Sequence, residues 1–158
     1  MRAKGFTLIE ILVVLIIIGI TIGFALLSFG DFGASRRAVV SAEQFANYIK
    51  LTQHRAILEM TPLGITINKE NFQTFRFEQN VWKPMVEKTI FRTQYFPSNI
   101  TVNLQRMHTI TKNPDIIISA SGDITPFSLD FGTNQKPKLA TVVGKPNGIV
   151  TVLLPRTP

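Results

Sequence analysis

The chain has 158 residues, 45% of them hydrophobic, no cysteine and a formal net charge of +7. Its length supports one modest globular domain, and the lack of cysteine excludes disulfides and thiolate metal sites. The excess of positive charge favours an anionic partner, either nucleic acid or anionic lipid.

The chain opens with a short basic stretch followed by a long apolar run. Residues 5–10 read Gly-Phe-Thr-Leu-Ile-Glu after Arg2 and Lys4, and residues 11–29 carry no charge. About 20 apolar residues are needed to cross a bilayer core, and only a helix satisfies their backbone groups there. The sequence therefore predicts a transmembrane helix over residues 6–29.

Glu10 lies at the edge of this apolar run. A carboxylate inside a membrane costs several kcal/mol and usually has a specific partner. Cleavage after Gly5 would create one, because it would free the α-amino group of Phe6, which could reach Glu10 of an adjacent copy. A secretory signal peptide or a plain single-pass anchor would also combine basic and apolar residues. Neither alternative explains the joint placement of Gly5, Phe6 and Glu10.

This pattern resembles the type IV pilin and pseudopilin signature, in which a short basic leader ends in Gly, the next residue is Phe, and Glu follows four positions on. The resemblance implies that a prepilin peptidase removes residues 1–5 by cleaving between Gly5 and Phe6. It also implies that the new Phe6 amine is N-methylated, and that Glu10 guides docking into a helical filament.

The apolar run is followed by a second helical stretch of different character. Gly30 and Gly33 predict a kink or a loosened turn, since glycine is unfavourable in a helix. Residues 30–61 are then expected to continue the helix outside the membrane, and Pro62 is expected to end it. Five apolar residues recur at helical spacing and form a stripe that needs a partner surface: Ala42, Phe45, Ile49, Ala56 and Met60.

Residues 62–158 have the period of two that is typical of half-buried strands. Alternating residues include Ile65 and Ile67, Phe75 and Phe77, Ile100, Val102 and Leu104, and Phe127, Leu129 and Phe131, with Ser128 and Asp130 expected to face outward. Residues 116–118 and 149–154 are further β-branched runs, and Asn147-Gly148 predicts a tight turn. The expected fold is α+β and pilin-like: a long N-terminal helix packed on a C-terminal antiparallel β domain of two small sheets.

The β domain also resembles the H-type minor pseudopilins (GspH) of type II secretion systems. The residues that carry this resemblance are Trp82-Lys83-Pro84, Pro97-Ser98-Asn99-Ile100 and residues 121–129. It implies a single-pass protein of the Gram-negative inner membrane with its β domain in the periplasm. It also implies a place at or near the pseudopilus tip with the I, J and K types, above a shaft of the major G type. An inner-membrane assembly platform would add the subunits, supporting export of folded proteins across the outer membrane.

A FimT-type minor pilin, which binds DNA in natural transformation, is the alternative. No acidic residue follows Asp130, whereas four basic residues do: Lys136, Lys138, Lys145 and Arg156. Such a stretch favours phosphate binding. However, the DNA-binding segment of FimT proteins has arginines just after a glycine near the C-terminus, whereas Ile149 follows Gly148 here. We therefore expect a solvated face rather than a nucleic-acid site.

No pattern in the chain predicts an enzyme, a cofactor or a metal site. His54 and His108 are the only histidines, and they form no metal-binding pair. Asp115, Asp123 and Asp130 lack the ligand spacing of a calcium loop, so turn and strand-edge roles are expected. Neither a phosphate-binding loop nor a nucleophile elbow occurs.

Overall fold

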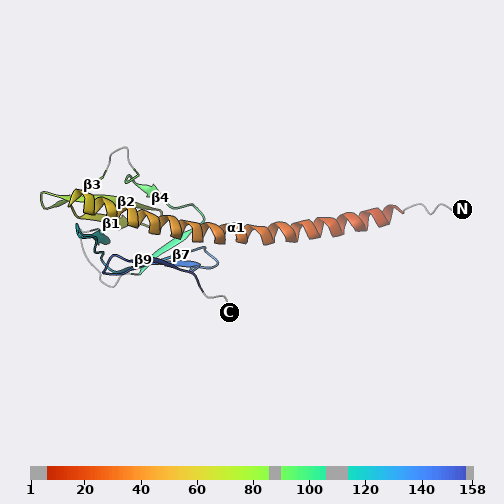
Figure 1. The fold of residues 1–158 in the computed structure, drawn as a ribbon. Helices are drawn as coiled ribbons and strands as arrows, with labels where there is room; N and C mark the ends of the chain where they lie inside the picture. The colour runs from red at the N-terminus through yellow and green to blue at the C-terminus, as the bar shows by residue number, and fades with distance from the viewer. Residues whose placement is uncertain (1–6, 86–89, 106–113, 156–158) are drawn as a thin grey trace. The chain divides into compact units, whose positions relative to one another are not determined.

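The computed structural model describes residues 7–85, 90–105 and 114–155. Helix α1 (Leu8–Glu59) runs through Gly30 and Gly33 without interruption, so the expected kink or loosened turn does not break the helix (Figure 1). Along this helix the chain divides into two units, Met1–Ala34 and Ser35–Pro158.

Helix α1 ends three residues before Pro62, close to the expected position. Met60 has a positive φ of 50°, the Met60 N–H donates to Ile57 O (3.2 Å), and the Thr61 N–H donates to Ala56 O (3.1 Å). This pair of bonds is the Schellman motif, which satisfies carbonyls left open at a helix end. Met60 therefore lies beyond the helix and is 84% exposed, so its predicted place in the buried stripe was wrong.

The first unit contains an apolar helical segment, Leu8–Ala25, with a mean hydropathy of 2.8. None of this segment is buried within the chain. The hydroxyl of Thr21 is satisfied inside the helix, because its Oγ1 lies 2.9 Å from both Ile17 O and Ile18 O. The segment is thus long and apolar enough to span a membrane, and its polar side chain other than Glu10, that of Thr21, has partners on the helix itself.

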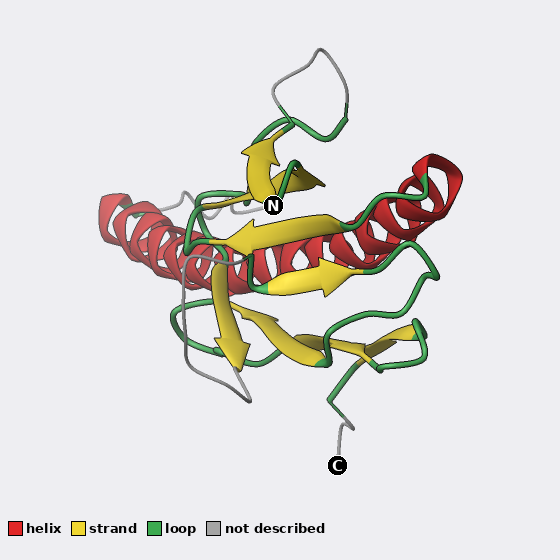
Figure 2. Ribbon diagram, turned by 90° about the vertical axis from the view of Figure 1, so that its left-hand side faces the viewer, coloured by secondary structure: helices red, strands yellow, loops and turns green. Residues whose placement is uncertain are grey.

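The second unit contains two antiparallel sheets that pack with the C-terminal part of α1 (Figure 2). The first has the order β3-β2-β1-β6, with β4 pairing with β2; its strands are β1 (Leu63–Ile67), β2 (Asn71–Glu78), β3 (Val81–Pro84), β4 (Gln94–Tyr95) and β6 (Ile116–Ile118). The second has the order β5-β7-β8-β9; its strands are β5 (Thr101–Gln105), β7 (Phe127–Gly132), β8 (Ala140–Gly144) and β9 (Val150–Leu153). The expected α+β, pilin-like fold with two antiparallel sheets is confirmed.

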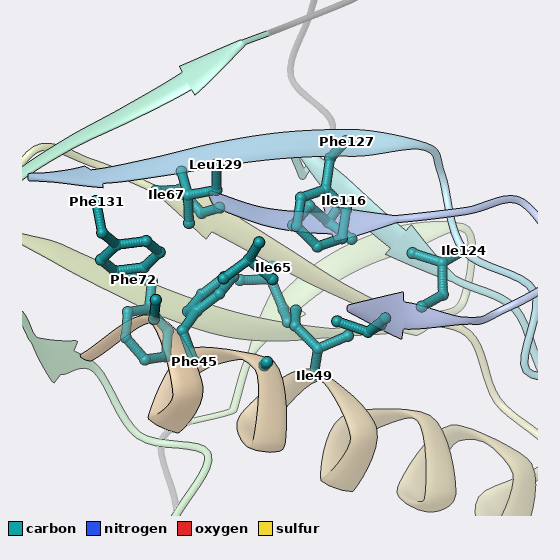
Figure 3. Close-up of a cluster of buried hydrophobic side chains, with 14 of the residues drawn as sticks. Phe45, Ile49, Ile65, Ile67, Phe72, Ile116, Ile124, Phe127, Leu129 and Phe131 are labelled. Carbon is teal, nitrogen blue, oxygen red and sulfur yellow. The ribbon is translucent and has the colours of Figure 1, made fainter. Parts of the chain in front are cut away.

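A single hydrophobic core joins the helix to both sheets (Figure 3). Phe45 lies at its centre and is 1% exposed. Its ring centroid lies 5.1 Å from that of Phe72 on the first sheet and 5.9 Å from that of Phe131 on the second. Ala42, Ile49 and Ala56 of the expected stripe are also buried, so the stripe meets both sheets at once.

The residues of strand β2 that face the core are not the alternating pair Phe75 and Phe77 noted in the sequence. Phe72 and Thr74 are buried, whereas Phe75 and Phe77 lie half-buried on the opposite face. There the ring of Phe77 packs 4.9 Å from that of Trp82. Aromatic residues occupy both faces of β2, and period two does not identify which face is buried.

Asp130 was expected to face outward, but it is 5% exposed. Its carboxylate accepts hydrogen bonds from Gln105 Nε2 (2.6 Å) and Thr141 Oγ1 (2.5 Å), and Lys138 Nζ lies 3.4 Å away. The connection from β7 to β8 folds back against the end of β7: a Cβ at Gly132 would lie 2.2 Å from the carbonyl carbon of Pro137. Asp130 therefore does lie on the face opposite Phe131, but that face is covered.

Candidate functional site

The candidate functional site is the N-terminal motif, residues 5–10, of which the structure describes residues 7–10. Gly5 and Phe6 lie outside the described residues, as do the other leader residues. The carbonyl of Thr7 accepts the N–H of Glu10 (3.0 Å) and that of Ile11 (3.4 Å). Glu10 therefore lies in the first turn of α1, where the positive end of the helix dipole favours a carboxylate.

Glu10 is the one ionisable side chain in residues 7–30. It is exposed, and within the described part of the chain no cation pairs with it. At the centre of a bilayer an acidic side chain costs about 3 kcal/mol, so it is normally paired. Any partner for Glu10 would come from residues that the structure does not describe, from a second copy or from another protein.

The other titratable residues considered from the sequence have structural surroundings. His54 is exposed on α1, and His108 lies outside the described residues. Asp115 Oδ2 accepts the N–H of Ile67 (2.7 Å), and Asp123 Oδ2 accepts the hydroxyl of Ser121 (2.6 Å). Among the residues that the structure describes, no three His, Asp or Glu side chains lie close enough to hold a metal ion.

Gln53 has a role that sequence reasoning missed. Its Nε2 donates to the carbonyls of Gly122 and Gly148, both at 2.9 Å. These glycines have φ values of 93° and 81°, in the turns that lead to β7 and β9. Gln53 therefore ties α1 to two turns that are 26 residues apart in sequence (148 − 122). The turn glycines were visible in the sequence, but their common partner was not.

A hollow of about 240 Å³ lies beside α1 in the second unit. It is lined by Ser41, Gln44, Phe45, Tyr48, Phe72, Gln94, Tyr95, Phe96 and Pro97. The Tyr48 hydroxyl hydrogen-bonds to that of Thr74. Burial raises the pKa of Tyr48, and the bond to Thr74 opposes this only in part.

The basic C-terminal residues differ in their surroundings. Lys136, Lys138 and Lys145 are exposed, in accord with the expected solvated face, and Arg156 lies outside the described residues. Lys138 pairs with Asp130, at 3.4 Å.

Comparison with known proteins identifies both halves of the chain. Residues 1–26 match the family model of the prokaryotic N-terminal methylation motif. Type II secretion system protein H of Escherichia coli K12 is 31% identical over 135 residues, covering 81% of this chain and 80% of that protein. Protein H of Pseudomonas aeruginosa is 29% identical over 145 residues, covering 82% and 83%.

Solved structures give the same fold. The minor pseudopilin EpsH from the type 2 secretion system of Vibrio cholerae matches with a TM-score of 0.66 at 17% identity, over 77% of this chain and 99% of that one. The solution structure of E. coli GspH matches with a TM-score of 0.64 at 24% identity, over 77% and 90%. The chain therefore belongs to the type II secretion system protein H (GspH) family: it is a minor pseudopilin, a structural, non-enzymatic subunit anchored in the inner membrane by its N-terminal helix.

Proposed function

We propose that this minor pseudopilin is built into the pseudopilus at or near its tip. There it would lie with the I, J and K types above a shaft of the G type, and would support export of folded proteins across the outer membrane. One observation carries the proposal: an apolar helical segment, Leu8–Ala25, is left uncovered by its own chain and has a single carboxylate at its start.

Processing would prepare this helix for assembly. A prepilin peptidase would cleave between Gly5 and Phe6 and methylate the Phe6 amine. The mature chain would then comprise a membrane span over residues 6–29, a periplasmic continuation of the helix over 30–61, and a periplasmic β domain over 62–158. The match of residues 1–26 to the methylation motif supports this order of events.

Docking would pair Glu10 with the Phe6 amine of a neighbouring subunit. Two unit charges 4 Å apart attract by about 4 kcal/mol at an effective dielectric of 20. This is comparable to the cost of about 3 kcal/mol for a lone carboxylate in the membrane. The pair would thus offset the burial of Glu10 only when a second subunit is present, so the carboxylate would favour assembly over the free state.

Substitution of Glu10 tests this docking step. Glu10→Val should insert into the membrane at least as well as the wild type, while copurification with the G, I, J and K pseudopilins and secretion should both fall. Thr21→Val is the matched control, because it also removes a polar group from the apolar helix, but one that is satisfied within it. Full secretion by Glu10→Val would show that the carboxylate is dispensable.

The choice of partner needs a second experiment. The full chain in detergent should be titrated with the soluble domains of the I, J and K types and, in parallel, with duplex DNA at two salt concentrations. We expect saturable binding to the pseudopilins and no salt-sensitive affinity for DNA. Strong salt-dependent DNA binding without pseudopilin binding would contradict the proposal.

A further inference from the structure

The second unit carries exposed cations where α1 enters it. Arg36 and Arg37 follow directly after Ser35, the first residue of this unit, and both are exposed. No carboxylate among the described residues forms an ion pair with either arginine. In the sequence, Arg36 follows Ala25, the end of the apolar segment, by eleven residues.

The loop between β7 and β8 lies at the same end of this unit. Gln53, further along α1, contacts Gly148 in the turn between β8 and β9, which is the opposite end of the second sheet. Phe45, two turns earlier in the helix, packs against Phe131 near the end of β7. Figure 3 shows the same order, with Phe45 and Phe131 toward one side of the core and Ile49 and Ile124 toward the other. Arg36 therefore lies toward the same end of this unit as the β7–β8 loop.

This loop presents two more cations on a fixed backbone. The Thr133 N–H donates to Lys136 O (2.8 Å), and the Lys136 N–H donates to Thr133 Oγ1 (3.1 Å). Lys136 and Lys138 are both exposed, and the charge of Lys138 is partly offset by Asp130. We call Arg36, Arg37, Lys136 and Lys138 the basic end of the domain.

Two exposed leucines lie at the same end of the second sheet as the β7–β8 loop. Leu153 pairs with Thr141 near the start of β8, so Leu154 follows at the same end of the sheet as the β7–β8 loop. Leu153 and Leu154 are 54% and 58% exposed. Cations combined with exposed apolar side chains are the chemistry of a surface that binds an anionic membrane.

We propose that the basic end binds anionic phospholipid headgroups on the periplasmic face of the membrane that the helix spans. The cations would pair with lipid phosphates, and the leucines would enter the interfacial layer. The contact would hold the β domain against the membrane before assembly and would be lost when the subunit leaves the bilayer. This proposal depends on the membrane anchor and is independent of the tip position and of Glu10.

The test uses the full chain in nanodiscs made of phosphatidylcholine alone or with about 30% phosphatidylglycerol. Because the chain has no cysteine, a single spin label can be placed on Asn134→Cys in the β7–β8 loop, or on Asn147→Cys at the opposite end as a reference. Collision with a water-soluble nickel chelate measures how far each label is shielded by lipid. We expect phosphatidylglycerol to shield the Asn134 label at low salt, high salt to reverse this, and the Asn147 label not to respond.

Charge variants then assign the effect to the basic end. Each cation near an anionic surface contributes about a fivefold factor, so R36Q/R37Q/K136Q should lower the docked-to-undocked ratio about 100-fold. K50Q/K83Q/K145Q is the matched control, because it removes the same charge elsewhere on the domain, and it should retain most of the shielding. The pair of Lys138 and buried Asp130 is left intact in both variants.

Three results would overturn the proposal. The first is a wild-type label that does not respond to phosphatidylglycerol. The second is shielding that is equal in the two charge variants, which would reflect net charge alone. The third is a wild-type chain that does not respond to the anionic lipid but binds duplex DNA, with this DNA binding lost in R36Q/R37Q/K136Q. That result would show that the basic end is a nucleic-acid surface.

Discussion

Phe45→Ala removes the side chain at which the helix and both sheets meet. Phe45 is 1% exposed, and its ring contacts those of Phe72, Phe96, Phe127 and Phe131 at centroid distances of 5.1 to 6.5 Å. Truncation of a buried phenylalanine to alanine typically costs about 3 to 5 kcal/mol, from lost transfer free energy and from the cavity. Edge-to-face pairs such as that with Phe72 add to the loss, so the upper half of this range is expected.

Urea unfolding of the full chain in detergent measures this loss. Trp82 is the only tryptophan and packs on Phe77 in the β domain, so its fluorescence reports unfolding of that domain. With an m-value of about 1.5 kcal/mol/M, a loss of about 4 kcal/mol lowers the midpoint by about 2 to 3 M. A domain stability of about 5 to 15 kcal/mol would fall to about 1 to 11 kcal/mol, so the variant is marginal at the lower end of this range.

Leu58→Ala is the control on the same helix. Leu58 is 80% exposed, so its truncation should change the free energy of unfolding by no more than about 0.5 kcal/mol. A loss below 1 kcal/mol for Phe45→Ala, or equal losses for the two variants, would refute the conclusion that this stripe of α1 joins the two sheets.

Four further predictions concern processing, packing and pH. Gly5→Leu should block leader removal, so intact-mass measurement should find residues 1–5 retained; a processed variant would contradict the cleavage site. Gln53→Ala should destabilise the β domain by about 1 to 3 kcal/mol in urea, because the carbonyls of Gly122 and Gly148 lose their donor; a loss under 0.5 kcal/mol would show that water replaces it. Gly148→Ala should cost more than about 1 kcal/mol by the same assay, since φ is 81° and the new Cβ would lie 2.6 Å from Gly122 O. Burial raises the pKa of Tyr48, so its contribution to stability is complete below the unfolded pKa of about 10 and is lost as pH rises through the folded pKa. Tyr48→Phe should therefore flatten the loss of stability as the pH rises above about 10, and an unchanged slope there would contradict this.

Family membership decides between the two functions considered from the sequence, in favour of the H-type pseudopilin over the FimT-type pilin. The N-terminal motif already favoured any pilin-like protein. The distinction depended on the β domain, whose individual motifs also serve as turns and strand starts. It needed similarity over most of the chain, including 81% coverage at 31% identity with the E. coli protein.

Local chemistry was sufficient to predict much of the architecture. The long apolar run requires a helix in a membrane, the positions of Ala42, Phe45 and Ile49 repeat with the period of a helix, and Pro62 limits its length. The β region followed from period two and from turn residues such as Gly148. These features depend on the backbone and on neighbours a few residues apart, which a linear sequence displays directly.

Only the tertiary structure decided which faces are buried and which distant residues meet. Phe72 rather than Phe75 faces the core because the helix covers that side of β2. Asp130 is buried because a loop folds back over its face, and Gln53 is half-buried because two remote turns converge on it. Alternation along a strand is the same whichever face is covered, so burial depends on the elements that pack against it.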